Sequence, residues 1–173
     1  MRLRKHIRRN ILIGGICISS MFAHAQTRTA KTYLKEYSPV AVSLMQETGI
    51  PASVIMGVAM LESGMGTSRN AKLLKNHFGI VGKNNLAKRG ETYRSKYKEY
   101  KTPEESYKHF VKVIAKKKWF SKLKGTTDVS VWLRSMSHSG YSSAGDLWIT
   151  RVSAMIKRYK LYELDDELNL AKE

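Results

Sequence analysis

The carboxyl group of Glu62 stands out because it closes an otherwise apolar stretch, GIPASVIMGVAMLES, residues 49–63. Pro51 suits the first position of a helix. Glu62 then lies at helical spacing from three apolar residues, Ile55, Val58 and Ala59. This spacing places them on one face of the helix. We therefore expect the carboxyl group to face the core or the wall of a cleft.

This position predicts a raised pKa for Glu62 and a role as proton donor. Gly64 suits a helix C-terminus, so Glu62 falls in the last turn, where the helix dipole disfavours a negative charge. Burial also disfavours the ionised form. Both effects favour a general acid near neutral pH. In the alternative interpretation, Glu62 reaches solvent from the helix end or pairs with one of the many lysines and arginines.

The residues after this helix have the composition of a binding cleft. A turn of small residues, SGMGTS at 63–68, lets backbone or ligand come close. The segment NHFGI, residues 76–80, places an aromatic ring beside a flexible glycine. We take four of these as candidate substrate-binding residues: Ser63, Asn76, Phe78 and Gly79. Tyr141 follows Gly140 outside any apolar stripe, so it is a further candidate for the cleft.

The elements that must position these residues are mostly helices. Ser38 and Pro39 have the types of an N-cap and a first helical residue, with a stop at Gly49, although the preceding segment can also extend this helix. Two further helices are expected over about 68–75 and 129–140. Another should begin at the Thr102 capping box, and the last should begin at an Asp146 cap and end at about residue 159. The tail from residue 165 is polar and expected to fray.

The exception is the segment 82–100, GKNNLAKRGETYRSKYKEY. It has turn residues early and three tyrosines later. This pattern fits a small hairpin or an irregular lobe beside the cleft. Because glycines bracket it and little apolar content fixes it, we expect it to be mobile.

The first 25 residues have the pattern of an export signal. A basic start, an apolar run over 11–22 and the sequence Ala23-His24-Ala25 match the three parts of a cleavable signal peptide. The run is too short to span a bilayer. Bulky Ile16 before Cys17, the only cysteine, argues against a lipid anchor. We predict a signal peptide at 1–25, one domain at 26–165, a polar tail at 166–173, and a location in the periplasm or outside the cell.

Charge and composition restrict the partners. The chain has 31 basic and 14 acidic residues, a net charge of +17. Without the five basic residues of the signal, 26 remain against 14 acidic ones, or +12. Export argues against nucleic acid and favours an anionic envelope polymer. The Lys116–Lys118 run fits a solvated helix end better than a nucleic-acid patch.

Nothing in the mature chain predicts a metal or other cofactor. Its three histidines, at 77, 109 and 138, do not have the spacing of metal ligands, and it has no cysteine for a disulfide. A chain of about 150 residues can form a hydrophobic core without metals or disulfides. We also expect a monomer.

Taken together, these motifs resemble the bacterial N-acetylglucosaminidases of glycoside hydrolase family 73, which include autolysins and flagellar rod hydrolases. The resemblance covers about residues 33–164 and rests on GIPASVIMGVAMLESGMGTS, NHFGI, the SY-x-x-F helix at 106–110, and GYSS with the terminal RYKLYELD. It implies a mainly α, lysozyme-like fold with a small β-hairpin lobe beside the cleft. It also implies cleavage of the β-1,4 bond between N-acetylglucosamine and N-acetylmuramic acid in peptidoglycan, with Glu62 as general acid.

The second half of the reaction has several candidates. The resemblance implies a second acidic residue in the lobe, for which Glu91 is the first candidate and Glu99 the second. Alternatively, the 2-acetamido group of the substrate acts, with Tyr141 positioned beside it. Lytic transglycosylases share the Glu-Ser-Gly helix end, but continue with a Gly-Leu-Met-Gln segment where this chain has NHFGI. A non-catalytic wall-binding or assembly protein is the alternative from another class.

Overall fold

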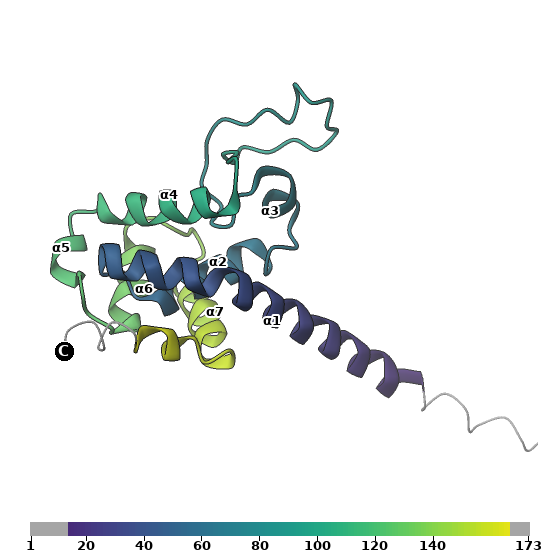
Figure 1. Ribbon diagram of the computed structural model, residues 1–173, viewed down its shortest axis with the longest axis horizontal. Helices are drawn as coiled ribbons and strands as arrows, with labels where there is room; N and C mark the ends of the chain where they lie inside the picture. The colour runs from purple at the N-terminus through teal and green to yellow at the C-terminus, as the bar shows by residue number, and fades with distance from the viewer. Residues whose placement is uncertain (1–13, 167–173) are drawn as a thin grey trace, which may run out of the picture.

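The computed structural model describes the backbone of residues 14–166 and the side chains from residue 29 onward. The first 13 residues of the predicted signal peptide and residues 167–173 of the predicted tail lie outside this range. The described chain is mainly helical (Figure 1). Its elements are α1 (Gly14–Thr48), α2 (Ala52–Ser63), α3 (Arg69–Leu74), α4 (Pro103–Ala115), α5 (Phe120–Leu123), α6 (Val129–His138), α7 (Gly145–Arg158) and a 3₁₀ helix, η1 (Leu161–Asp165).

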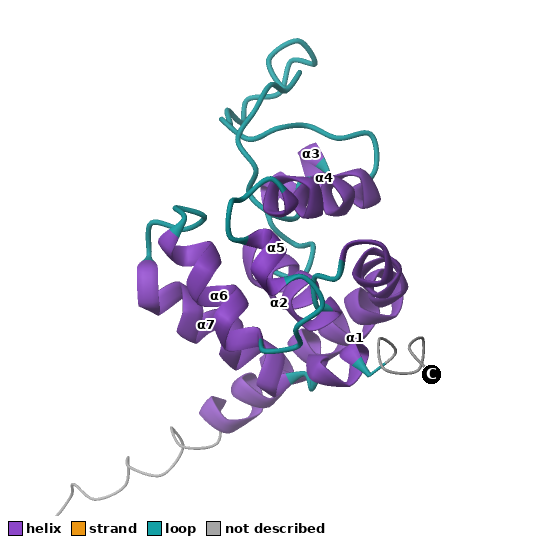
Figure 2. Cartoon of the chain, turned by 90° about the vertical axis from the view of Figure 1, so that its left-hand side faces the viewer, coloured by secondary structure: helices purple, strands orange, loops and turns teal. Residues whose placement is uncertain are grey.

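Helix α2 is the centre of the fold. It packs against α1, α7 and η1, and ten of its 12 residues are buried. A helix that is apolar all round belongs inside a protein rather than at its surface, and Figure 2 shows α2 surrounded by the other helices. Gly57 makes the contact with α7 possible, because a Cβ there would lie 2.7 Å from Ile156 Cγ1. The burial of α2 leaves its C-terminal end, with Glu62, at the edge of the core.

Both ends of α2 are fixed by specific groups. Gly64 adopts the left-handed conformation, with φ 57° and ψ 45°, as predicted for the helix stop. At the other end, Asp165 accepts hydrogen bonds from the Ser53 backbone N–H at 2.8 Å and from the Ser53 hydroxyl. Asp165 is only 6% exposed, so the prediction that the tail frays from residue 165 is wrong at this residue.

The helix starts were predicted with mixed success. Thr102 caps α4 as predicted, by accepting a hydrogen bond from the Glu105 N–H. Ser68 caps α3 by accepting one from the Ala71 N–H, at the predicted start of that helix. Pro39, however, lies inside α1 instead of beginning a helix, so the longer alternative is the observed one. Helix α7 begins at Gly145, with Asp146 in its first turn rather than at its cap. No helix of the described chain is both long and apolar enough to cross a membrane.

The predicted β-hairpin lobe does not form. Among the described residues there is no strand, only an isolated antiparallel bridge between Val81 and Tyr97. The segment between α3 and α4 extends away from the helices as an irregular loop (Figure 1). The family resemblance implied strands here, and this expectation was wrong.

Side-chain amide hydrogen bonds join the two sides of this loop, where a hairpin would have a ladder of backbone hydrogen bonds. The Asn84 amide donates to the carbonyl groups of Ser95 and Tyr97, at 2.7 and 2.9 Å. Only a few backbone bonds join the two sides, such as Lys98 N–H to the Ile80 carbonyl at 2.8 Å. Because the segment is polar and rich in lysine, it has too little apolar surface to support a sheet of its own.

Candidate active site

The carboxyl group of Glu62 is held by an indole from a distant helix. Trp148 Nε1 donates a hydrogen bond of 2.8 Å to Glu62 Oε1. Trp148 lies in the first turns of α7 and is 3% exposed, so its ring is fixed by packing. A buried tryptophan normally finds a partner for its N–H. Here that partner is the side chain that sequence analysis singled out.

The environment of Glu62 gives it the properties of an acid. Glu62 is partly buried, and this burial raises the pKa of its carboxyl group, while the Trp148 hydrogen bond opposes the rise. The raised pKa agrees with the prediction, and loss of solvent is its main cause. A protonated carboxyl group at a partly open site can donate a proton to a bound ligand.

The loop after α3 forms a wall beside this carboxyl group. A Cβ on Gly79 would lie 3.6 Å from Glu62 Oε2 and 3.8 Å from Tyr97 Cε1. Gly79 also has a φ of +65°, which side chains disfavour. The backbone therefore passes close to the carboxyl group, and Tyr97 lies on the same side of the loop.

Tyr141 is a further member of the group of residues around Glu62, and it contacts both Phe78 and Trp148. Its hydroxyl donates to the Phe78 carbonyl at 2.9 Å, and its ring lies 5.4 Å from that of Trp148. Burial and the nearby charge of Glu62 raise the pKa of Tyr141 well above its usual range, so it remains a neutral phenol. The structure thus brings together Glu62, Gly79 and Tyr141 of the predicted site, and adds Trp148.

Asn76 and Phe78 shape this wall from behind. Asn76 is 1% exposed, and its amide donates to the carbonyl groups of Ile80 and Lys98 at 2.9 and 2.8 Å. These bonds tie together the two sides of the loop. Phe78 stacks on Phe110, with ring centroids 4.2 Å apart. Both side chains are buried, so they position the loop instead of presenting groups to a ligand.

Ser63 points into the helical body. It has no exposed surface, and its hydroxyl donates to the Ala59 carbonyl at 2.6 Å and accepts from Gly66 N–H at 2.9 Å. It also lies beside Tyr33, whose hydroxyl contacts His77 Nδ1 at 2.7 Å. The structure therefore gives Ser63 a packing role and separates it from the Glu62 side chain.

The two predicted candidates for a second acid lie in the loop. Glu91 follows Gly90 in a turn, where its N–H bonds to the Leu86 carbonyl at 3.0 Å. No hydrogen bond or ion pair joins its side chain to the group around Glu62 in the part of the chain that the structure describes. Its role stays a prediction.

Glu99, the second of these candidates, is engaged elsewhere. Its carboxylate pairs with Arg89 and accepts a hydrogen bond of 2.7 Å from the Asn85 N–H. The Asn85 bond is the main reason that the pKa of Glu99 is lowered. An ionised, paired carboxylate is poorly suited to exchange protons with a substrate.

Sequence analysis missed Trp148 and Tyr97. Trp148 opens the apolar face of the last helix, and the need of an indole N–H for a partner was the signal that could have marked it. Tyr97 carries no such signal, because its place depends on the path of an irregular loop. Over residues 29–166, no group of three or more His, Cys, Asp or Glu side chains is arranged to hold a metal ion.

The family model for glucosaminidases, described as mannosyl-glycoprotein endo-beta-N-acetylglucosaminidase, matches residues 38–161, well over half of the chain. The chain belongs to the glucosaminidase family. Its active-site candidates Glu62, Tyr97, Tyr141 and Trp148 all lie within the match. As a member of the glucosaminidase family, the chain is a glycoside hydrolase. A comparison with curated protein sequences found no match.

Solved structures share the fold of this glucosaminidase. The catalytic domain of the autolysin Auto from Listeria monocytogenes has a TM-score of 0.61 and 21% identity, over 79% of this chain and 88% of that one. A peptidoglycan hydrolase from Sphingomonas sp. A1 has a TM-score of 0.61 and 19% identity, over 80% and 95%. A truncated glycoside hydrolase domain of FlgJ from Salmonella typhimurium has a TM-score of 0.59 and 18% identity, over 76% and 97%. These likenesses confirm the mainly helical fold.

Proposed function

We propose that this glucosaminidase is an exported peptidoglycan hydrolase that cleaves the β-1,4 bond between N-acetylglucosamine and N-acetylmuramic acid. The observation that carries the proposal is the Glu62 carboxyl group, partly buried, with a raised pKa and a fixed indole partner. The family supplies the reaction class. Two of the solved structures that share its fold are named peptidoglycan hydrolase and autolysin, which favours the same polymer.

In this proposal Glu62 protonates the leaving oxygen as the glycosidic bond breaks. Burial raises the pKa of the carboxyl group and so favours its protonated form before the reaction. The Trp148 N–H bond has the opposite effect, because it stabilises the carboxylate that remains after the proton has left. The pair therefore balances proton retention against proton release, which is the requirement for a general acid.

The second half of the reaction needs a group that traps or stabilises the oxocarbenium-like centre. We favour the 2-acetamido group of the substrate, with Tyr141 beside it, because Tyr141 contacts the ring that holds Glu62. Water activated by Glu91 is the alternative. It requires a carboxylate separation of roughly 6.5 to 9.5 Å from Glu62 while substrate is bound.

Mass spectrometry of the products tests the bond that is cleaved. Purified peptidoglycan digested by the enzyme should yield fragments with reducing N-acetylglucosamine ends. Fragments that end in 1,6-anhydro-muramic acid would instead identify a lytic transglycosylase. Binding without any fragments would identify a wall-binding or assembly protein that has kept the fold.

Export through the predicted signal peptide is part of the proposal. Cleavage after Ala25 would fall within α1, before Ala30, the first residue of the described core. Removal of the signal peptide would therefore leave every residue of the described core in the mature protein. N-terminal sequencing of protein recovered from the envelope or the medium should begin at Gln26, whereas an intact Met1 there would contradict this part of the proposal.

A further inference from the structure

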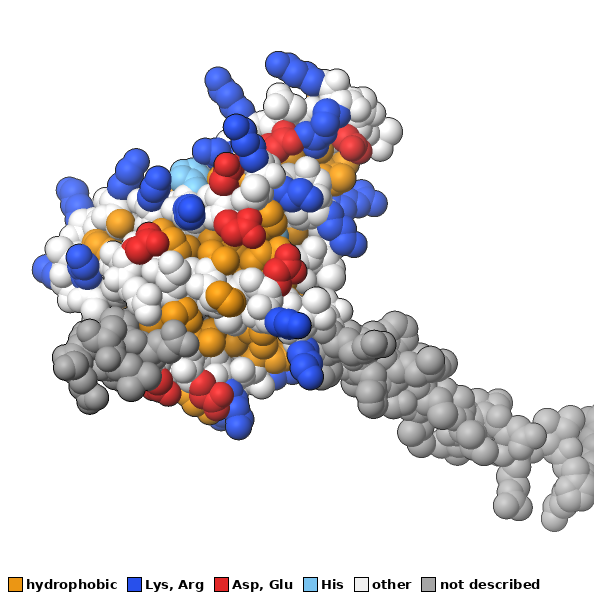
Figure 3. All heavy atoms as spheres, viewed as in Figure 1, with side chains coloured by type: hydrophobic (Ala, Val, Ile, Leu, Met, Phe, Trp, Pro, Cys, Tyr) orange, Lys and Arg blue, Asp and Glu red, His pale blue; other side chains and the backbone are white. Residues whose placement is uncertain are grey.

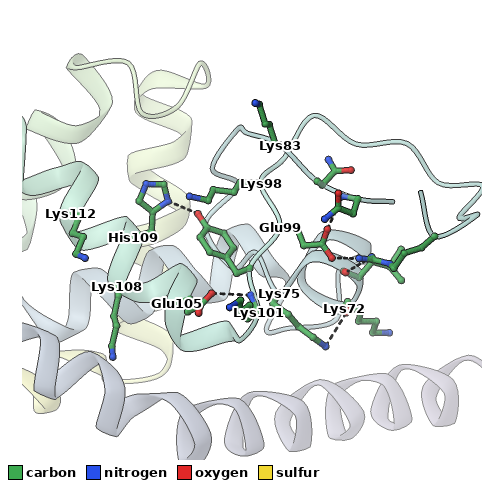
Figure 4. A pocket seen from close by; sticks show the side chains of 15 residues that line it. Lys72, Lys75, Lys83, Lys98, Glu99, Lys101, Glu105, Lys108, His109 and Lys112 are labelled. Atoms are coloured by element: carbon green, nitrogen blue, oxygen red, sulfur yellow. Dashed lines mark hydrogen bonds and ion pairs between the residues drawn. The ribbon is translucent and has the colours of Figure 1, made fainter. Parts of the chain in front are cut away.

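A groove lined by lysines lies on the loop between α3 and α4. It has a volume of about 1090 Å³ and is bordered by α3, the loop and α4 (Figure 4). We call it the lysine groove and define it by the lysines of all three elements: Lys72, Lys75, Lys83, Lys98, Lys101, Lys108 and Lys112. Glu62, Tyr141 and Trp148 do not line it. The groove is thus separate from the candidate active site.

No ion pair of the described chain neutralises the lysines of this groove. Of its two carboxylates, Glu99 is paired with Arg89, and Glu105 accepts a hydrogen bond of 2.9 Å from the Lys101 backbone N–H. In the described chain the ion pairs are Arg89–Glu99 and Lys160–Glu163, and neither involves a lysine of the groove. Figure 3 shows Lys and Arg side chains over this part of the molecule.

His109 lies in the groove wall. Its Nδ1 is 2.7 Å from the Tyr100 hydroxyl, as Figure 4 shows. Burial first, and then the charges of Lys98, Lys116 and Lys112, lower the pKa of His109. A concave surface of one sign concentrates its field and attracts ligands of the opposite sign.

The groove and the active site share the loop as a common wall. Tyr97 lies beside Gly79, next to Glu62, whereas the following residue, Lys98, lines the groove. These two residues are adjacent in the loop, so the loop separates the groove from the candidate active site at this point. The Asn76 amide fixes this segment through the Lys98 carbonyl. A polymer with its backbone at Glu62 and charged branches beside it would therefore meet the groove on the other side of this loop.

We propose that the lysine groove binds the carboxylates of the short peptides attached to the glycan strand that is cleaved at Glu62. This inference rests on the proposed function. Lysine suits such a ligand, because its ammonium group is a flexible point charge that can follow carboxylates in variable positions. The arginine that lines the groove, Arg89, is already paired. The groove thus favours peptide-bearing glycan over bare glycan.

The test compares two variants of equal charge. The groove variant is Lys83→Gln, Lys98→Gln and Lys108→Gln. The control is Lys118→Gln, Lys122→Gln and Lys157→Gln, at exposed positions that do not line the groove. Initial rates are measured on peptidoglycan fragments that carry peptides, and on the same glycan after an amidase has removed them. Circular dichroism melts verify that each variant is folded.

The groove variant should raise KM for peptide-bearing glycan by about fivefold to tenfold at low salt, with kcat unchanged. On stripped glycan it should match wild type, and the control should match wild type on both substrates. Equal KM increases for the two variants would overturn the proposal, because net charge alone would then explain binding. A loss of activity on stripped glycan by the groove variant would also overturn it.

A binding measurement separates this inference from the proposed function. In a Glu62→Gln background, pelleting with insoluble peptidoglycan should depend on the groove lysines and weaken as salt rises. If wild type cleaves neither glycan, the proposed function fails, while pelleting still decides the role of the groove. Tighter groove-dependent binding of inorganic polyphosphate or a DNA oligonucleotide than of peptide-bearing fragments would assign the groove to phosphate polymers and contradict the proposal.

Discussion

The indole N–H of Trp148 donates a 2.8 Å hydrogen bond to Glu62 Oε1 across 86 residues of sequence. The bond joins the end of the central helix α2 to the first turns of α7. A hydrogen bond to a carboxylate stabilises its charged form. Trp148 therefore adjusts the proton affinity of Glu62 while its buried ring holds the carboxyl group in place.

Replacing Trp148 by Phe should move the pH profile of kcat/KM. The change removes the hydrogen bond that lowers the pKa of Glu62, so this pKa rises further. Because the proposed acid must be protonated, the basic limb should shift to higher pH. We also expect kcat to fall by about tenfold, since the carboxylate product loses a bond.

Trp132→Phe is the matched control for this change. Trp132 is also buried, but its indole N–H bonds to the Thr126 carbonyl, at 2.9 Å. Trp132→Phe should leave the basic limb of the kcat/KM profile in place, even if the substitution lowers the melting temperature. An unmoved limb in Trp148→Phe would show that the hydrogen bond does not control the titration.

Glu62→Gln should leave a folded protein that no longer digests peptidoglycan. The amide keeps the shape of the side chain but cannot donate the proton, and general acid catalysis contributes about 10² to 10⁴-fold. Turbidity loss of a peptidoglycan suspension measures the rate. Digestion near the wild-type rate would remove Glu62 from the mechanism.

The same substitution should change stability in a pH-dependent way. The pKa of Glu62 is higher in the folded protein than its usual value. Its contribution to stability is therefore fully present below the unfolded pKa and is lost as pH rises through the folded pKa. The melting temperature of Glu62→Gln relative to wild type should increase between acidic and neutral pH. A constant difference would indicate that the folded pKa is not raised.

Tyr141→Phe and Glu91→Gln together separate the two routes for the second half of the reaction. If the acetamido group acts, Tyr141→Phe should lower kcat by orders of magnitude, and Glu91→Gln should have little effect. If Glu91 activates water, Glu91→Gln should lower kcat by orders of magnitude and Tyr141→Phe should have little effect. The Glu62→Gln variant should still bind glycan in that case. Small losses in both variants would leave neither residue with a catalytic role.

Asp165→Ala should lower the free energy of unfolding by about 2 kcal/mol. The change leaves the N–H and hydroxyl of Ser53 without their carboxylate partner, inside the core. Asp166→Ala is the control, because Asp166 is exposed. Urea unfolding of both variants measures the difference, and equal stability would mean that the contact adds nothing to α2.

The sequence by itself located the central helix and its acid. Glu62 and the Gly64 stop were predictable because a helix end depends on residues within one turn of it. The Thr102 cap was predictable for the same reason. The hydrogen bonds of both helix ends close over three or four residues, so a local pattern contains all the information.

Only the tertiary structure decided which groups surround Glu62. Trp148 and Tyr97 come from elements far away in sequence, and Asp165 reaches α2 over 112 residues. Local pattern also failed at Pro39, since packing of the surrounding helix outweighed its helix-starting preference. Such partners depend on how the faces of several helices meet. The free energy of that arrangement comes from contacts between residues far apart in the sequence, so the neighbours of a single residue do not reveal it.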